Sequence, residues 1–229
     1  MALAALPRRD AAAREHLDNS GRHARPVVLA RDRSVVLAGE LAGMVPGGSL
    51  TRGSVLCVEA AAGSARCGQV AGAGSTTVAF ELAAAVTAVG EWVGAIDLDG
   101  TFGALAARDA GVTLERFAVV RRVPPSRWAA VVAALLDGVS LVLAEMPRRV
   151  GLGDARRLVA RAREREAILV VHAPPGRWPA GATLTLSAEG SEWSGLDCAG
   201  YLTGRALHVR VEGRGAAARP RLGELARAG

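Results

Sequence analysis

The sequence contains no lysine. All 28 of its basic residues are arginines, in a chain of 229 residues with a formal net charge of +6. A lysine ammonium is a compact point charge on a flexible stem, and the planar guanidinium of arginine does not reproduce it. Any mechanism that depends on a lysine side chain is therefore excluded.

Cysteine and histidine are also scarce, with three and four residues. Cys57, Cys67 and Cys198 form no Cys-x-x-Cys pair, and none has a metal-like spacing from a histidine. An odd number of cysteines in a cytosolic chain, which we expect here, indicates reduced thiols rather than disulfides. We therefore expect no metal site, and we expect Cys57, which lies in an apolar run, to be part of the core.

Long uninterrupted apolar runs are absent as well. The longest candidate, residues 78–96, carries Glu81 and Glu91, which a membrane-spanning helix would not tolerate. At the N-terminus the arginines follow a short apolar stretch instead of preceding it, and a secretory signal has the opposite order. We expect a cytoplasmic protein that makes no membrane contact.

Positive charge is concentrated at the two ends of the chain. Residues 1–54 hold 8 arginines against 5 acidic residues, residues 55–204 hold 14 against 15, and residues 205–229 hold 6 against 2. A nucleic-acid-binding surface usually forms a basic stripe on the folded body. Solvated termini explain this distribution at least as well as a nucleic-acid site does.

Apolar runs alternate with segments of helical periodicity through most of the chain. Nearly continuous Val, Ile and Leu runs, separated by helices, are typical of a parallel sheet that is covered on both faces. After Pro174 shorter runs at 183–187, 198–202 and 207–211 predict three antiparallel strands at one edge of the sheet. The sequence thus predicts an α/β fold. Its predicted parts are an N-terminal helix and linker (1–45), a core (46–212) and a flexible basic tail (213–229).

Three short motifs occur in the order found in a RecA ATPase core. Residues 74–77, Gly-Ser-Thr-Thr, lie where a phosphate-binding P-loop would end in Gly-Lys-Thr-Thr. Asp99 follows a run that resembles the strand carrying the catalytic carboxylate of RecA, and residues 141–145 resemble the Walker B strand. The chain is therefore similar to a RecA-like core, which implies a mostly parallel central sheet flanked by helices.

A narrower resemblance covers roughly residues 35–215. The segments at 50–54, 128–138 and 154–164 are similar to the shortened RecA-like proteins of high-GC bacteria called ImuA-prime. This resemblance implies an accessory protein of damage-induced, error-prone translesion DNA synthesis in the SOS response. It also implies the polymerase-like adaptor ImuB as a partner, together with an error-prone DnaE-type polymerase. RecA itself is a further candidate partner, and DNA would be contacted only indirectly or weakly.

The predicted nucleotide site lacks essential parts. A P-loop needs a lysine that reaches the phosphates, and Ser75 stands at that position. The loop at 60–74 also has about twice the spacing of a Gly-x4-Gly-Lys motif. We expect residues 75–77 to cap a helix instead, with no bound cofactor and no catalysis. The residues of this vestigial nucleotide site are Gly74, Ser75, Thr76, Thr77, Asp99 and Glu145.

The DNA-binding elements of a RecA core are also predicted to be absent. The apolar run 168–171 is followed by His172 and Ala173, so an alanine stands where RecA has its switch glutamine. Residues 174–181 are too few to hold both the DNA-binding loop and its helix. We expect His172 to be structural and the arginine-rich helix at 154–166 to form a solvated, ion-paired face.

The leading hypothesis is a non-catalytic protein that binds a partner. The family resemblance favours the basic C-terminal part for the contact with the adaptor, and the predicted helix at 7–17 for a contact with a RecA protomer. The residues predicted to contact the partner are Arg205, Arg210, Arg214, Arg219 and Arg221.

Three alternatives remain open. The first is a divergent ATPase that works without lysine through Thr76, Asp99 and Glu145. The second is a protein that binds single-stranded DNA with its basic ends, which predicts a steep dependence on salt. The third is a regulator similar to the cell-division inhibitor SulA. The oligomeric state stays open.

Overall fold

The computed structural model describes residues 33–60, 74–195 and 202–228. The chain divides into two units, residues 1–32 and 33–229, and all described residues belong to the second. The predicted helix at 7–17 and most of the loop at 60–74 lie outside the described residues, as do Cys67 and Cys198. Within the described part, no helix is long and apolar enough to cross a membrane.

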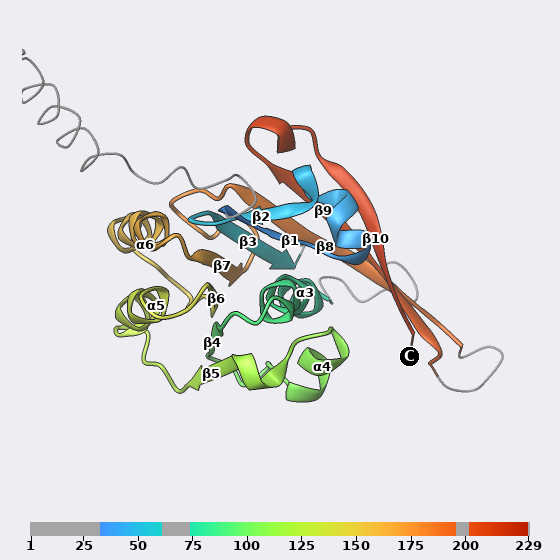
Figure 1. Ribbon diagram of the computed structural model, residues 1–229, viewed down its shortest axis with the longest axis horizontal. Coiled ribbons are helices and arrows are strands. Elements are labelled where there is room, and N and C mark those ends of the chain that lie inside the picture. Colours follow the sequence, from blue (N-terminus) through green and yellow to red (C-terminus); the bar gives the residue numbers. More distant parts are fainter. Residues whose placement is uncertain (1–32, 61–73, 196–201, 229) are drawn as a thin grey trace, which may run out of the picture. The chain divides into compact units, whose positions relative to one another are not determined.

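An eight-stranded mixed sheet forms the centre of this unit (Figure 1). Its strands stand in the order β10-β9-β8-β3-β7-β6-β4-β5. The six strands from β8 to β5 are parallel, and β9 and β10 add antiparallel pairs at the edge that starts with β8. The strands are β3 (Val55–Ala60), β4 (Val93–Asp97), β5 (Phe117–Arg121), β6 (Leu141–Glu145), β7 (Ile168–Ala173), β8 (Leu184–Ser194), β9 (Gly204–Gly213) and β10 (Arg221–Ala228).

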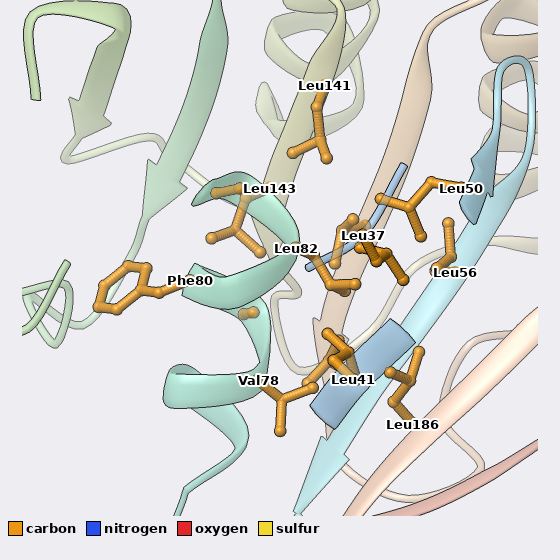
Figure 2. Close-up of a cluster of buried hydrophobic side chains, with 14 of the residues drawn as sticks. Leu37, Leu41, Leu50, Leu56, Val78, Phe80, Leu82, Leu141, Leu143 and Leu186 are labelled. Atoms are coloured by element: carbon orange, nitrogen blue, oxygen red, sulfur yellow. The ribbon is translucent and has the colours of Figure 1, made fainter. Parts of the chain in front are cut away.

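Helices cover both faces of the sheet. On one face α2 (Gly39–Met44), α3 (Ser75–Ala88) and α4 (Ala104–Asp109) pack on the strands, together with the small sheet formed by β1 (Ser34–Val36) and β2 (Ser49–Thr51). Figure 2 shows the leucines and other apolar side chains that meet in this cluster. The opposite face carries α5 (Trp128–Leu136) and α6 (Leu152–Arg165), which lie next to each other in Figure 1.

The local sequence explains these elements. Strands β6 and β7 are buried almost throughout, as expected for parallel strands covered on both faces. Helix α6 is amphipathic, because Ala155, Leu158 and Ala162 recur at helical spacing and are buried while most of its arginines face solvent. Cys57 in β3 is buried as predicted, and burial raises the pKa of its thiol to about 12.

The predicted fold class is confirmed: the sheet is mostly parallel, helices flank it, and antiparallel strands occupy its C-terminal edge. The details of that edge differ from the prediction. The first edge strand, β8, runs parallel to β3, and the strand predicted at 198–202 lies almost wholly outside the described residues. Three short 3-10 helices, Pro46–Gly48, Leu114–Arg116 and Gly215–Ala217, complete the described elements.

The prediction of a flexible tail from residue 213 was wrong for β10, which pairs with β9 along its whole length. Two contacts with α2 hold β10 at the edge of the sheet. Glu40 accepts a hydrogen bond from the Ala226 N–H at 2.8 Å, and the Met44 side chain lies directly over Gly223. A Cβ at Gly223 would come within 2.1 Å of the Met44 sulfur, so any larger residue would force the Met44 side chain to move. Residues 33–45, predicted as a linker, thus pack on the sheet.

Candidate functional site

Polar side chains gather where the parallel strands end. Asp97 is the last residue of β4, Glu145 is the last residue of β6, and His172 is the penultimate residue of β7. The carboxyl ends of parallel strands meet at one edge of a sheet, where α/β proteins usually bind their ligands. This edge, together with the start of α3, is the candidate site.

The start of α3 differs from the prediction. The N-cap residue is Gly74, in a left-handed conformation with φ 114°, and no side chain caps the helix. Ser75 is the first helical residue, and its Oγ lies 2.9 Å from Nε2 of His172. Burial lowers the pKa of the His172 imidazole, so this hydrogen bond joins a neutral ring to the hydroxyl at neutral pH. The interpretation of residues 75–77 as a side-chain cap was therefore wrong.

Glu145 is bonded to the backbone that follows β4. Its Oε2 accepts hydrogen bonds from the N–H groups of Leu98 at 2.7 Å and Asp99 at 3.1 Å. Burial raises the pKa of the Glu145 carboxyl, and the two N–H donors partly offset that effect. The two predicted residues, Glu145 and Asp99, are thus brought together. Asp99 takes part through its backbone N–H, and the residue is exposed.

Asp97 is a site residue that sequence reasoning missed. Its side chain is inaccessible to solvent, accepts a hydrogen bond from the Thr101 N–H at 2.9 Å, and forms an ion pair with Arg121 at 2.9 Å. The available signal was its place as the last residue of a buried apolar run. Asp99, two residues later, was chosen instead because it stands at the position that matches RecA.

Arg205 of β9 lies beside the first turn of α3, although the two are far apart in the sequence. Its Nη1 donates a hydrogen bond to Oγ1 of Thr77 at 3.4 Å, and its guanidinium carbon lies 4.9 Å from the centre of the Trp193 ring. A Cβ added to Gly74 would come within 2.7 Å of Nη2 and 2.4 Å of the Leu207 side chain. Side chains of β9 thus occupy the space next to the N-terminus of α3.

The other C-terminal arginines are in different surroundings. Arg210 forms an ion pair with Glu189, while Arg214, Arg219 and Arg221 are exposed. Arg205 is half-buried, and burial lowers the pKa of its guanidinium. Their predicted role in partner binding stays a prediction, and the three exposed arginines are the most accessible for it.

The chemical capacity of the site follows from these contacts. The Ser75 hydroxyl, the His172 imidazole and the carboxylates of Asp97 and Glu145 are all bonded to groups of the chain itself. In the described part of the chain, no group of three or more His, Cys, Asp or Glu side chains could hold a metal ion. The arrangement ties the start of α3 to the end of β7, and Ser75, whose hydroxyl lies against the His172 imidazole, is itself buried.

A His172→Gln variant tests whether the buried His172 imidazole is neutral in the folded protein. A group whose pKa is lowered by folding contributes stability above its unfolded pKa, about 6.5 for histidine, and this contribution is lost as the pH falls. We expect the wild-type free energy of unfolding to decrease below pH 6.5 by up to about 1.4 kcal/mol per pH unit from this group. Urea unfolding at pH 7.5 and 5.5 should show a smaller decrease in the variant, and equal decreases would contradict the assignment.

The chain matches a known protein family. The family model described as "MT3502 N-terminal domain" matches residues 43–180, which is more than half of the chain. The match includes the strands from β2 to β7, and therefore Ser75 and the three polar residues at the carboxyl ends of the strands, and it ends before β8. No curated protein matches the chain.

Proposed function

The chain belongs to the MT3502 N-terminal domain family, and we propose that it is a non-catalytic, RecA-like accessory protein that acts by binding partner proteins. The sheet order and the antiparallel C-terminal edge support the RecA-like part of the proposal. The motifs described above support the narrower assignment to the ImuA-prime type. On this basis the protein acts in the cytoplasm, in damage-induced translesion synthesis, with the adaptor ImuB as its main partner and RecA as a second one.

One observation carries the non-catalytic assignment. The carboxylates that could hold a metal ion or activate water, Asp97 and Glu145, are each bonded to two groups of the chain. A triphosphate site also needs a cation and free N–H groups at the start of its helix. Here the sequence contains no lysine, and the side chains of Arg205 and Leu207 lie against Gly74. These contacts support the proposal that the chain does not bind ATP and Mg²⁺.

Titration of the full-length protein with ATP and Mg²⁺ tests this assignment. We expect no saturable binding in the micromolar range by calorimetry, no thermal stabilisation and no phosphate release. Because ligand binding to the folded state raises the apparent stability, a thermal shift would reveal even a site that binds ATP without hydrolysing it. Saturable binding that Thr76→Ala abolishes would contradict the proposal.

One observation favours the alternative of a lysine-free nucleotide site. Arg205 places a cation beside the first turn of α3, and its buried Nε has no hydrogen-bond partner among the described residues. An anion bound at this helix N-terminus would satisfy that donor. The same titration with Arg205→Ala distinguishes a nucleotide site from a protein that only binds partners. If ATP binds through the Arg205 guanidinium, the variant must lose ATP binding.

The partner contact needs a test that leaves the sheet intact. Truncation after residue 204 would remove β9 and β10, which are part of the sheet, so it would not separate folding from binding. Charge reversal of Arg214, Arg219 and Arg221, which are exposed, avoids this problem. We expect the triple Arg→Glu variant to lose co-purification with the adaptor, and reversal of the exposed Arg108 and Arg156 to leave it unchanged. Equal co-purification by both variants would overturn the C-terminal assignment.

A further inference from the structure

A groove runs between α5 and α6 on the face of the sheet opposite α3. It has a volume of about 640 Å³. The wall on α5 is formed by Trp128 and three small residues, Ala129, Ala130 and Ala133, which we call the alanine wall. The wall on α6 is a row of charged residues at helical spacing, namely Asp154, Arg157, Arg161 and Glu164.

A basic mouth opens at one end of the groove. A second cavity of about 630 Å³ shares Pro125, Pro147 and Arg149 with the groove, and Arg148 and Arg177 also line it. The two cavities are therefore adjacent. We call the three exposed arginines that surround the second cavity, Arg148, Arg149 and Arg177, the basic mouth.

The arginines of the mouth differ from those along the groove wall. Arg157 is paired with Asp154, and Arg161 is paired with Asp137. Among the described residues, no carboxylate pairs with any arginine of the basic mouth, and the one contact there is a hydrogen bond of 3.4 Å from Arg177 to the backbone carbonyl of Arg148. The mouth thus offers three unneutralised guanidinium groups beside Pro125 and Pro147.

The loop that carries Arg177 is held on both sides. The Gly176 N–H donates a hydrogen bond to Glu59 at 3.1 Å, and the Trp178 indole N–H donates one to the Gly181 carbonyl at 3.2 Å. Trp178 is itself buried in the core. Because its neighbours are anchored, Arg177 is presented from a defined backbone position, and this lowers the entropy cost of binding an anionic partner.

We propose that the groove and its basic mouth bind a segment of a partner protein. The segment has apolar side chains that lie along the alanine wall and acidic side chains at the end that meets the basic mouth. Helices commonly bind in this way, with apolar anchors in a groove and charges at the rim that set their direction. The inference goes beyond the proposed function, because it involves none of the residues of the vestigial nucleotide site and none of the C-terminal arginines.

The charges favour a protein segment over a nucleic acid. The α6 wall carries two acidic residues for its two arginines, so it does not offer the continuous basic track that a phosphate backbone requires. Binding of single strands also relies on aromatic side chains that stack on bases, but Trp128 and Trp178 are 1% and 7% exposed. The chain's own residues 1–32 carry six arginines against four acidic residues, so their charge does not complement the mouth either.

Fluorescence anisotropy with the full-length protein tests the inference. The probe is a labelled 16-residue amphipathic peptide with leucine and alanine on one face and four glutamates at one end. We expect saturable binding that becomes at least about tenfold weaker when the three arginines of the basic mouth are changed to glutamate. The same peptide with lysine in place of glutamate should bind that variant better than it binds the wild type.

Two matched variants and a second probe complete the design. Reversal of Arg33, Arg108 and Arg156, which are exposed and line neither cavity, changes the net charge equally and should leave peptide affinity unchanged. In contrast, Ala130→Trp, at an exposed position of the alanine wall, should block binding. A dT20 oligonucleotide serves as the competing probe. The inference is overturned if the acidic peptide does not bind the wild type, if both charge-reversal variants weaken it equally, or if the oligonucleotide binds the mouth more tightly.

Discussion

Replacing Trp128 with alanine is expected to lower the free energy of unfolding by about 3–5 kcal/mol, the usual loss for a buried large aromatic residue. Trp128 is the first residue of α5 and is 1% exposed within the cluster that joins α5 and α6 to the sheet. Its indole N–H also donates a hydrogen bond of 2.8 Å to the Glu145 carbonyl at the end of β6. Denaturant unfolding followed by circular dichroism measures the loss.

A Trp128→Phe variant separates the two contributions. Phenylalanine keeps most of the buried apolar surface but leaves the Glu145 carbonyl without its indole donor, which costs about 1–3 kcal/mol. We therefore expect the Phe variant to lie between the wild type and the Ala variant. If the free energies of unfolding of Trp128→Ala and the wild type differ by less than about 1 kcal/mol, the packing of α5 does not depend on Trp128.

Phe80→Ala is expected to cause a loss of similar size, about 3–5 kcal/mol, on the other face of the sheet. All three phenylalanines of the chain meet there. Phe80 of α3 is 1% exposed, and its ring lies edge-on to Phe102 and Phe117, with centroids 5.5 and 6.0 Å away. Such aromatic pairs add about 0.5–1.5 kcal/mol beyond the buried area.

Phe117→Ala provides the matched control for this cluster. Phe117 contacts the same ring but is only partly buried, so its removal should cost clearly less than removal of Phe80. Thermal and urea unfolding of the two variants side by side measure the difference. Equal losses would mean that the contact between the rings, rather than the burial of Phe80, determines the stability.

The elements of the parallel core could be predicted because their signals are local. The apolar runs of β6 and β7 and the helical spacing in α6 each lie within one segment, so the fold class followed from the pattern. The C-terminal edge could not be predicted in the same way. Residues 221–228 have a composition typical of a tail, and they form a strand because β9 offers a partner while Met44 and Glu40 of α2 hold it.

The candidate site was predicted only in part for the same reason. Glu145 and Asp99 were both identified because they stand at positions that resemble motifs of RecA. Which of two neighbouring aspartates is buried depends on the packing around the strand end, and the structure buries Asp97. The bond between Ser75 and His172 joins residues 97 positions apart, so no local pattern in the sequence reveals it.

The sequence alone determined that no lysine is available anywhere in the chain, and composition is independent of folding. It also determined the alternation of strands and helices, since each signal comes from neighbours within one turn or one strand. Only the tertiary structure decided what surrounds the start of α3 and where unpaired arginines collect. Arg205 reaches Thr77 across 128 positions, and the basic mouth combines arginines from two separate loops. Contacts between distant segments depend on the packing of the whole sheet, which no local pattern encodes.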